Sequence, residues 1–528
     1  MKKTEPSHAQ SDPAKRARES GLRYLESIPP EALDTELISE LSVEWARQNC
    51  VLPIRLDDVP CVLTSDPDSV DAQEYLSMLV GLELTPVVAS RDTIQEAIES
   101  IFYHREDSPE AYLESIGANE DEADRGPIVS GDDLLESSRE APVIQLVNLI
   151  LLEAVKQRAS DIHFEPRPQG VRVRYRIDGM LYEQSAPPRE FQDALISRLK
   201  VMAHMDIAER RLPQDGMAKV RVGGREIDLR ASTIPVPDGE RVVLRLLNAN
   251  LVQLNLETLG MGESMRDAFG VLVQNPNGLI VVSGPTGSGK TTSLYAALAM
   301  LDAKRRNILT IEEPIEYQLA DIGQIQVRPK IGLTFANGLR HILRQDPDVI
   351  LVGETRDAET AEISIRAALT GHLVFTTLHT NDAPSAVLRL CDMGIEPFLL
   401  ASCLRSVLAQ RLVRSLCKAC RVSRPLTDHD RALFDTHGVN VFVERRAHAV
   451  GCSECLEGYA GRQGIFELMQ FGREEARAIH DGSVSVAELQ SLAERRGMRS
   501  MVQDGLQKAL LGETSLEEVL ATVAYDVS

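Results

Sequence analysis

Four short apolar runs in the second half of the chain determine its predicted architecture. They cover residues 278–282, 307–311, 349–352 and 373–377, and each leads into a glycine-rich loop or polar residues. Helical sequence separates them, so strands alternate with helices. This order is typical of a parallel α/β sheet, in which ligands bind at the carboxyl ends of the strands. We therefore expect the residues that follow the four runs to lie close together.

The loop after the first run has the sequence that a phosphate-binding site requires. It fits G-x-x-x-x-G-K-(S/T) without a gap and leads into helix formers over 293–301. Backbone N–H groups and the helix N-terminus attract phosphate, Lys290 is expected to reach the β- and γ-phosphates, and Thr291 to ligate Mg²⁺. A glycine turn before a helix is the alternative, but strand, loop, Lys-Thr pair and helix all coincide here. We predict that ATP is bound by Gly284, Pro285, Thr286, Gly287, Ser288, Gly289, Lys290, Thr291 and Thr292.

Polar residues after the other three runs suit nucleotide hydrolysis. Glu354 follows 349–352 and is predicted to lie beside Mg²⁺ and its waters. Glu316 follows the second run and is a candidate to orient the attacking water. His379, and as a second candidate His372, could sense the γ-phosphate through a hydrogen bond.

Arginines recur on the predicted strands of a preceding region, which opens with a helix over 142–158. Residues 171–179 alternate apolar and basic side chains with period two, so the basic ones share one face of a strand. A solvated sheet face is one interpretation, and contact with phosphate across a domain or subunit boundary is the other. The arginines concerned are Arg172, Arg174 and Arg176 on that strand and Arg230, Arg241 and Arg245 on two later predicted strands.

A small mixed α/β domain is predicted over residues 30–105. Its pattern indicates a helix over 36–49, strands over 51–56 and 61–65, and two later helices. It contains no catalytic constellation, so we interpret it as an interaction domain. The acidic stretch 106–138 is predicted to be a linker, with a switch segment that touches a basic partner as the alternative.

Length, charge and polarity restrict the class of protein. A chain of 528 residues is too long for one core and suggests three or four domains. The net charge of −22 argues against nonspecific nucleic-acid binding, which needs clustered Lys and Arg. Residues 1–29 are polar, which predicts a disordered tail and no signal peptide. The most apolar segment, 143–155, is too short for a bilayer, so we expect no transmembrane span and a reducing, cytoplasmic setting.

Four of the eight cysteines form two C-x-x-C pairs. Four thiolates can surround one tetrahedral Zn²⁺, and a reducing compartment disfavours disulfides. A rubredoxin-like iron site has the same ligands, but nothing else in the sequence asks for redox chemistry. The predicted zinc ligands are Cys417, Cys420, Cys452 and Cys455. Cys50, Cys61, Cys391 and Cys403 show no ligand spacing and are interpreted as packing residues.

The motifs, in this order, resemble the secretion ATPase superfamily, which comprises type II secretion and type IV pilus motors. The match runs from about residue 134 to the C-terminus. The cysteine arm and an N-terminal domain resemble the type II secretion assembly ATPase or a pilus extension ATPase, whereas retraction ATPases lack the arm. The N-terminal region is one small domain similar to that of the type II secretion ATPase, so the resemblance favours the secretion motor. The motifs are Ala-Ser-Asp-Ile-His at 159–163, Arg-Leu-Pro-Gln-Asp-Gly at 211–216, the phosphate loop, Gly-Leu-Thr-Phe at 332–335, Leu-Arg-Gln-Asp-Pro-Asp at 343–348, Gly-Glu-Thr-Arg-Asp at 353–357 and Thr-Gly-His-Leu-Val at 370–374.

The resemblance implies a RecA-like P-loop ATPase domain preceded by an α+β, PAS-like domain, in a hexamer that binds nucleotide between these domains. The implied segments are a tail (1–29), an N-terminal platform-interaction domain (30–105), a linker (106–138), the second domain (139–258), the ATPase domain (259–414), the zinc arm (415–460) and a helical C-terminal region (461–528).

The resemblance also implies roles and partners. It puts Glu316 at the catalytic position of an acidic box over 312–316, and it directs Arg230 and Arg245 to the phosphates. Arg340, Arg344 and Arg356 match arginines near the site. The implied partners are other copies in a homo-hexamer, the cytoplasmic domain of an inner-membrane secretion-platform protein, bound by the N-terminal domain, and a polytopic platform protein. The motor would be cytoplasmic and attached peripherally to the inner membrane.

Three positions depart from the family pattern: Glu313 replaces an aspartate, Met217 replaces an arginine, and Thr355 replaces an apolar residue. A pilus extension motor, a nucleic-acid translocase and a nucleotide-regulated adaptor without turnover remain as alternative functions.

Overall fold

The computed structural model describes residues 13–38, 41–103, 109, 112–113, 142–222, 225–247, 255–481 and 485–524. The chain divides into two compact units, Met1–Ala249 and Asn250–Ser528. No described helix has both the length and the apolar character that a membrane span requires.

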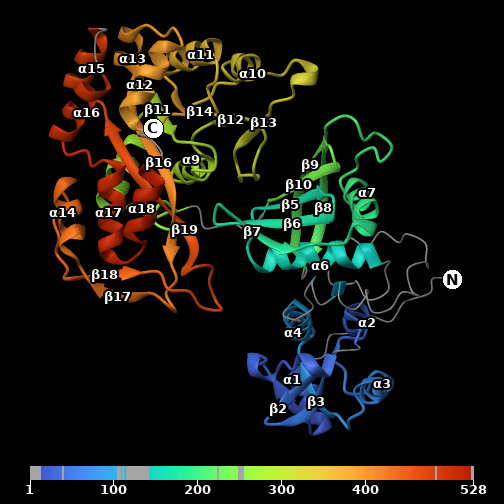
Figure 1. The fold of residues 1–528 in the computed structure, drawn as a ribbon. Coiled ribbons are helices and arrows are strands. Elements are labelled where there is room, and N and C mark those ends of the chain that lie inside the picture. Colours follow the sequence, from blue (N-terminus) through green and yellow to red (C-terminus); the bar gives the residue numbers. More distant parts are fainter. Residues whose placement is uncertain are drawn as a thin grey trace. The chain divides into compact units, whose positions relative to one another are not determined.

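A four-stranded sheet in the order β1-β4-β3-β2 forms the N-terminal part of the first unit (Figure 1). Its strands are β1 (Arg23–Leu25), β2 (Val51–Leu56), β3 (Val59–Thr64) and β4 (Thr85–Ala89). Only the β2–β3 hairpin is antiparallel. The apolar strand residues and the inner faces of the helices share one core. The helices are α1 (Pro13–Ser20), α2 (Val43–Asn49), α3 (Val70–Val80) and α4 (Arg91–Tyr103), with 3-10 turns at Pro30–Ala32 and Thr35–Ile38.

The structure differs from two predictions in this region. Part of the predicted tail is ordered, because Ala17 of α1 is buried and β1 extends the sheet by pairing with β4. The predicted helix over 36–49 is interrupted, because Ser42 is extended (φ −77°, ψ 131°) and a new helix starts at Val43. Residues 1–12, and all of the acidic segment 106–138 except residues 109, 112 and 113, lie outside the described residues.

The rest of the first unit is an α+β domain with a six-stranded antiparallel sheet, ordered β7-β6-β5-β10-β9-β8. The strands are β5 (Asp161–Arg167), β6 (Gly170–Ile177), β7 (Met180–Ser185), β8 (Gln214–Val222), β9 (Arg225–Val236) and β10 (Gly239–Leu247). Helices α6 (Pro142–Lys156) and α7 (Gln192–Met202) lie beside this sheet (Figure 1). The inner side chains of β6 are apolar, and the Tyr175 hydroxyl donates to the Ile150 carbonyl of α6 at 2.7 Å. The predicted arginines lie on the opposite face because the side chains of a strand alternate.

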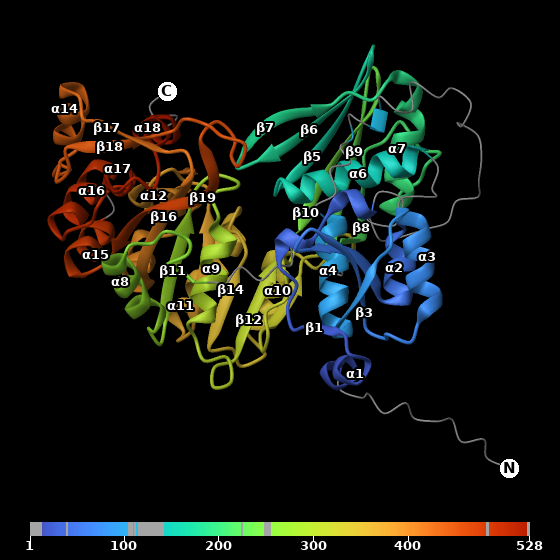
Figure 2. The ribbon, with the colours of Figure 1, turned by 90° about the horizontal axis from the view of Figure 1, so that it is seen from below.

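A seven-stranded sheet, ordered β13-β12-β14-β15-β11-β16-β19, organises the second unit. Figure 2 labels its strands β12, β14, β11, β16 and β19. All neighbours are parallel except β16 and β19. The strands are β11 (Gly278–Ser283), β12 (Ile308–Glu312), β13 (Gly323–Gln326), β14 (Val349–Val352), β15 (Leu373–Leu378), β16 (Leu404–Leu416) and β19 (Tyr459–Gln470). The four predicted apolar runs are β11, β12, β14 and β15, and the parallel α/β prediction is confirmed.

Helices cover both faces of this sheet. Alternate residues of β11 enter two different cores: Leu279 and Val281 face one, and Ile280 and Val282 face the other. This explains why the strand is apolar throughout. The helices are α8 (Glu263–Val273), α9 (Lys290–Ala299), α10 (Phe335–Ile342), α11 (Ala358–Leu369), α12 (Ala383–Asp392), α13 (Pro397–Cys403), α15 (Arg473–His480) and α16 (Val486–Arg495), with a 3-10 turn at Pro329–Ile331.

The cysteine arm leaves the sheet between β16 and β19. It contains the antiparallel pair β17 (Val422–Pro425) and β18 (Arg445–His448) and helix α14 (Asp428–Thr436). The arm packs on α17 (Met501–Leu511) and α18 (Leu516–Ala524) through a core that includes Phe434 and Leu506. A polar contact adds to it: Arg446 is buried and pairs with Glu517 at 2.9 Å. The arm and the C-terminal helices therefore form one packed layer.

Candidate active site and metal centre

The glycine-rich loop lies between the buried central strand β11 and the start of α9. Gly284, Gly287 and Gly289 have φ values of 147°, 80° and 85°, which residues with side chains rarely adopt. A Cβ atom at Gly284 would lie 2.4 Å from the Gln410 carbonyl oxygen, so only glycine fits there. The N–H groups of the first turn of α9 have no partners within the helix, which makes this end attractive to phosphate. The local fold therefore has the shape that the sequence predicted.

Lys290 is the first residue of α9 and lies against the loop. Its Nζ donates to the Gly284 carbonyl at 2.7 Å and to the Pro285 carbonyl at 2.9 Å. Burial lowers the pKa of Lys290 to about 8, and the negative charge of Glu354 opposes this shift. The loop 284–289 and the start of α9 are called the cradle below. The ammonium group of Lys290 is therefore held against the cradle, where it interacts with the negative charge of Glu354.

Glu354 and His379 approach the cradle from neighbouring strands. Glu354 follows β14, and its side chain is largely buried; His379 follows β15 and places Nε2 3.7 Å from the Glu354 carboxylate. Burial lowers the pKa of His379, and the charge of Lys290 lowers it further against the effect of Glu354. The Arg356 guanidinium lies 2.5 Å from the Glu354 carboxylate. Lys290, Glu354 and His379 thus form one electrostatic cluster at the carboxyl edge of the sheet.

His372 does not belong to this cluster, so its prediction as a γ-phosphate sensor in the site of its own chain is wrong. It precedes β15, whereas His379 follows it, and a six-residue strand separates the two by about 20 Å. Its Nδ1 is 2.9 Å from the Ala367 carbonyl at the end of α11. The sequence pattern places both histidines beside a strand but does not show that they occupy opposite ends of it.

The acidic box follows β12 at the same edge of the sheet. Glu312 is buried and is held by three groups: the Tyr295 hydroxyl of α9, the Thr310 hydroxyl at 2.5 Å and the Gln324 amide at 3.2 Å. Glu316 is exposed and lies four residues after the end of β12. Glu312 therefore ties the box to the phosphate-loop helix, whereas Glu313 and Glu316 are accessible to water.

Two of the departures from the family pattern have visible surroundings. Thr355 is buried, but its hydroxyl meets the Thr376 hydroxyl at 2.7 Å, so the polar group has a partner. Met217 is exposed and lies directly opposite Arg230 on the neighbouring strand. Glu313, the third departure, is exposed, so its extra methylene meets no packing limit.

Arg230 and Arg245 are direct cross-strand neighbours on the exposed face of the α+β domain. Arg245 Nε donates to Asp161 of β5 at 2.9 Å, and Asp161 is itself buried. The two arginines belong to the first unit and the cradle to the second, so their predicted contact with phosphate stays a prediction. Arg340, another predicted arginine near the site, lies 2.5 Å from Glu359 on the surface.

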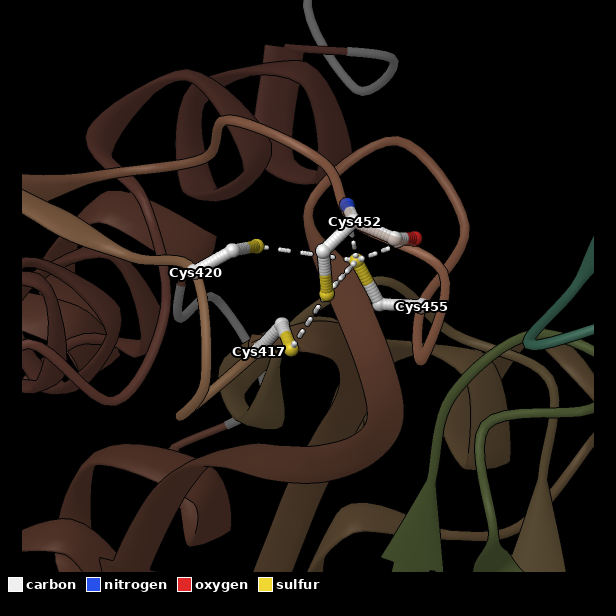
Figure 3. Close-up of side chains that lie close together, drawn as sticks. All are labelled: Cys417, Cys420, Cys452 and Cys455. Atoms are coloured by element: carbon white, nitrogen blue, oxygen red, sulfur yellow. Dashed lines mark hydrogen bonds between the residues drawn. The ribbon is translucent and has the colours of Figure 1, made fainter.

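The four predicted zinc ligands come together at the base of the arm (Figure 3). Cys417 and Cys420 lie between β16 and β17, and Cys452 and Cys455 lie between β18 and β19. All four sulfur atoms lie within 4.8 Å of one another, and the closest pairs are 3.6–3.9 Å apart. Tetrahedral ligands at about 2.3 Å from Zn²⁺ would be about 3.8 Å apart. The thiols therefore fit one tetrahedral metal ion.

Backbone amides support the thiolate form of this cluster. The N–H groups of Gly451 and Cys452 donate to the sulfurs of Cys420 and Cys455 at 3.4 and 3.3 Å. Backbone hydrogen bonds lower the pKa of Cys417 to about 7, whereas burial and the neighbouring thiols raise the pKa of Cys420 and of Cys452. Thiolates are the metal-binding form of cysteine, so the backbone donors favour ligation most directly at Cys417.

Comparison with known families shows to which family the chain belongs. A sequence model described as "Type II/IV secretion system protein" matches residues 136–521, and an "MshEN domain" model matches residues 20–108. The chain belongs to the type II/IV secretion system protein family. The resemblance inferred from the motifs is therefore confirmed, and the chain is an ATPase of this family.

Relatives of both branches match nearly the whole chain. "Type II secretion system protein E" of Aeromonas hydrophila is 48% identical over 501 residues, covering 93% of this chain and 99% of the relative. "Type IV pilus assembly ATPase PilB" of Myxococcus xanthus is 44% identical over 500 residues, covering 94% and 88%. The X-ray structure of the Legionella pneumophila ATPase DotB covers 77% of this chain and all of that chain, with a TM-score of 0.55 and 21% identity, which supports the fold alone.

Three supporting residues of this family member were not predicted from its sequence. Gln410 of β16 is buried, and its amide donates to the Ser288 carbonyl of the phosphate loop at 2.5 Å. Arg411 donates to Asn381, two residues after His379, at 3.3 Å and to the Thr522 carbonyl of α18 at 2.6 Å. The signal available was a polar pair inside the otherwise apolar stretch 407–413 of this strand.

Glu467 of β19 is the third, and it joins two helix N-termini. Its carboxylate accepts from Ala383 N of α12 at 2.8 Å and from Met501 N of α17 at 3.2 Å. Helix α12 starts four residues after His379, so this link and that of Arg411 both connect the His379 loop to the C-terminal helices. Backbone donors at a distance of many residues are invisible in a sequence, which is why neither link was predicted.

The thiol of Cys403 should be nearly inert, as its interpretation as a packing residue requires. It is buried in the core of the second unit, and burial raises its pKa to about 12. At pH 8 almost no thiolate is present, so we expect iodoacetamide to react roughly a thousandfold more slowly than with an ordinary thiol. Mass spectrometry of the native, labelled protein measures this rate. Labelling of Cys403 as fast as in urea would contradict the burial.

Proposed function

We propose that this chain is the ATPase motor of a type II secretion system and couples ATP hydrolysis to pseudopilus assembly at the inner membrane. The observation that carries the proposal is the convergence of Lys290, Glu354 and His379 on one cradle, in a chain of this family. The cluster supplies a cation for the phosphates, a carboxylate for the metal and a hydrogen-bonding group next to both.

The proposed chemistry uses positioned charges. Lys290 binds the β- and γ-phosphates, and Thr291 with Glu354 holds Mg²⁺, which neutralises phosphate charge when bound. Glu316 orients the attacking water, and His379 detects the γ-phosphate by a hydrogen bond. Arg230 and Arg245 are proposed to stabilise phosphate charge when the domains of a hexamer close, with Asp161 holding Arg245 in place. Zn²⁺ at the four cysteines is proposed to be structural, because all four ligand positions are filled by protein.

The two links described above suggest how hydrolysis moves the rest of the unit. Arg411 and Glu467 tie the loop after His379 to α17 and α18. Those helices carry the cysteine arm through the Arg446–Glu517 pair. A shift of the His379 loop on loss of the γ-phosphate would therefore act on the arm as well as on the cradle.

Secretion is preferred to pilus extension because the type II relative is covered almost end to end and is slightly more identical. In this proposal the N-terminal domain binds the cytoplasmic domain of an inner-membrane platform protein, and a polytopic platform protein receives the motion. The motor is cytoplasmic and attaches to the membrane through these partners, and it does not act on nucleic acid.

Deletion of the gene tests the branch of the family. The expected result is loss of extracellular enzymes with surface pili retained, and recovery with the wild-type gene but not with Lys290→Ala. Loss of pili with normal secretion would instead favour the pilus extension motor. ATP turnover stimulated by DNA, with a steep dependence on salt, would favour a translocase.

A further inference from the structure

Helix α3 of the N-terminal domain exposes apolar side chains that its own core does not need. Tyr75 is 46% exposed, Met78 83% and Leu82 43%. Tyr75 and Met78 are three residues apart and share one side of the helix, and Leu82 follows its left-handed end at Gly81. The adjoining side of the helix supplies Ala72 and Leu76 to the core. Tyr75, Met78 and Leu82, with Trp45 beside them, are called the α3 face below.

An aromatic contact makes part of this face rigid. Trp45 of α2 and Tyr75 lie with their ring centroids 4.4 Å apart and their planes tilted by 38°. Trp45, the one tryptophan of the chain, is partly buried against the N-terminal core and so fixes the neighbouring ring. A pre-ordered aromatic beside a flexible methionine is typical of surfaces on which a few residues supply most of the binding free energy.

The charged side chains on α3 and on its flanking turns are all acidic. No Lys or Arg occurs between Arg55 and Arg91. Arg16 of α1 approaches one end of the region, 4.0 Å from Asp66. The exposed acidic residues on α3 and on its flanking turns are Asp66, Asp68, Asp71, Glu74 and Glu83.

We propose that the α3 face is a docking surface for a protein segment that presents apolar side chains flanked by Lys and Arg. The inference deepens the proposed function, on which it rests, by assigning the surface of the N-terminal domain that binds the platform. Acidic side chains repel anionic lipid and nucleic acid. A second copy of the same face would bring like charges together. A segment of another protein with both basic and apolar side chains would pair with the acidic residues and cover the exposed apolar side chains.

Binding of the full-length chain to the purified cytoplasmic domain of the platform protein tests this surface. We expect Met78→Asp to raise the dissociation constant about tenfold or more, because it puts a charge in the centre of the contact. Glu74→Lys should weaken binding severalfold and reduce its dependence on salt. Some Lys→Glu or Arg→Glu substitutions in the platform domain should weaken its binding to the wild-type chain. Glu74→Lys should restore that binding.

Two matched variants control for the substitutions themselves. Val271→Asp charges an apolar helix residue of the second unit that is 73% exposed, and Glu96→Lys reverses an exposed charge on α4 of the same N-terminal domain. Both should bind like the wild type. Thermal unfolding of each variant shows whether the fold is intact, and Met78 is exposed enough for no change to be expected.

The outcomes separate this inference from the proposed function. If the wild type binds the platform domain and Met78→Asp and Glu74→Lys bind equally well, the α3 face is not the docking surface while the proposed function stands. If the wild type does not bind at all, the proposed partner fails and this inference fails with it. Loss of hexamers, or of binding to anionic vesicles, in the α3 variants alone would identify a different occupant and overturn the inference.

Discussion

Lys290→Ala should reduce ATP turnover at least about a hundredfold, which is the scale on which removal of one positioned charge acts on a transition state. The Nζ atom donates to the loop carbonyls of Gly284 and Pro285, so truncation removes the cation without opening the core. The fold should persist because the loop glycines and Gln410 hold the cradle independently. Steady-state turnover of the purified chain with Mg²⁺ and ATP measures the effect, and a fluorescent nucleotide measures binding separately.

Lys304→Ala is the matched control for this prediction, since Lys304 is an exposed lysine in the turn before β12. It should turn over ATP like the wild type. Turnover by Lys290→Ala within twofold of wild type would rule out the cradle as the hydrolysis site. ATP binding without turnover in the wild type, even in the presence of the platform protein, would point to a nucleotide-regulated adaptor.

Cys452→Ser should abolish stoichiometric zinc binding and loosen the arm. Three thiolates and one weakly binding hydroxyl hold Zn²⁺ much less tightly than four thiolates. Structural zinc contributes on the order of 10 kcal/mol to small zinc domains. The sulfur lies 3.6 Å from that of Cys455 and 3.9 Å from that of Cys417, so all the ligands lose a neighbour. Metal analysis of the purified chain should find about one zinc ion in the wild type and close to none in the variant.

Hydrogen exchange extends this test to the C-terminal helices. The arm is tied to them by Arg421, which donates to the Gly512 carbonyl, and by Arg446. Faster exchange should therefore appear in residues 416–459 and spread to the end of α17. Cys391→Ser changes a cysteine outside the cluster and should retain both zinc and protection. Unchanged zinc in Cys452→Ser would count against the four-thiolate site, and iron in the wild type would favour the rubredoxin-like alternative.

Local patterns predicted the parts of this chain in which one segment contains the whole signal. The phosphate loop needs glycines at positive φ, a lysine and a helix start within nine residues, and all of these are adjacent in sequence. The strands β11, β12, β14 and β15 are buried on both faces, so each reads as an apolar run. The cysteine pairs were predicted because ligand spacing is itself a sequence property.

Predictions were wrong where a contact far along the chain decides the outcome. The order of residues 13–25 depends on β4, more than sixty residues later, which gives β1 a hydrogen-bonding partner. The position of His372 depends on the direction of β15 in the sheet, which puts it at the amino edge. Gln410 and Glu467 have partners more than eighty residues away, so their roles have no local pattern.

By itself the sequence determined the fold class, the family, the phosphate-binding loop and the identity of the cysteine cluster, because each depends on residues that are close in sequence. The tertiary structure decided which polar residues meet the loop and which do not, since parallel strands bring only their carboxyl ends to one edge. It also decided that the loop after His379 is held by Arg411 and Glu467 against the C-terminal helices. Those contacts exist because burial leaves backbone and side-chain polar groups that must find partners inside the fold, wherever in the chain the partners occur.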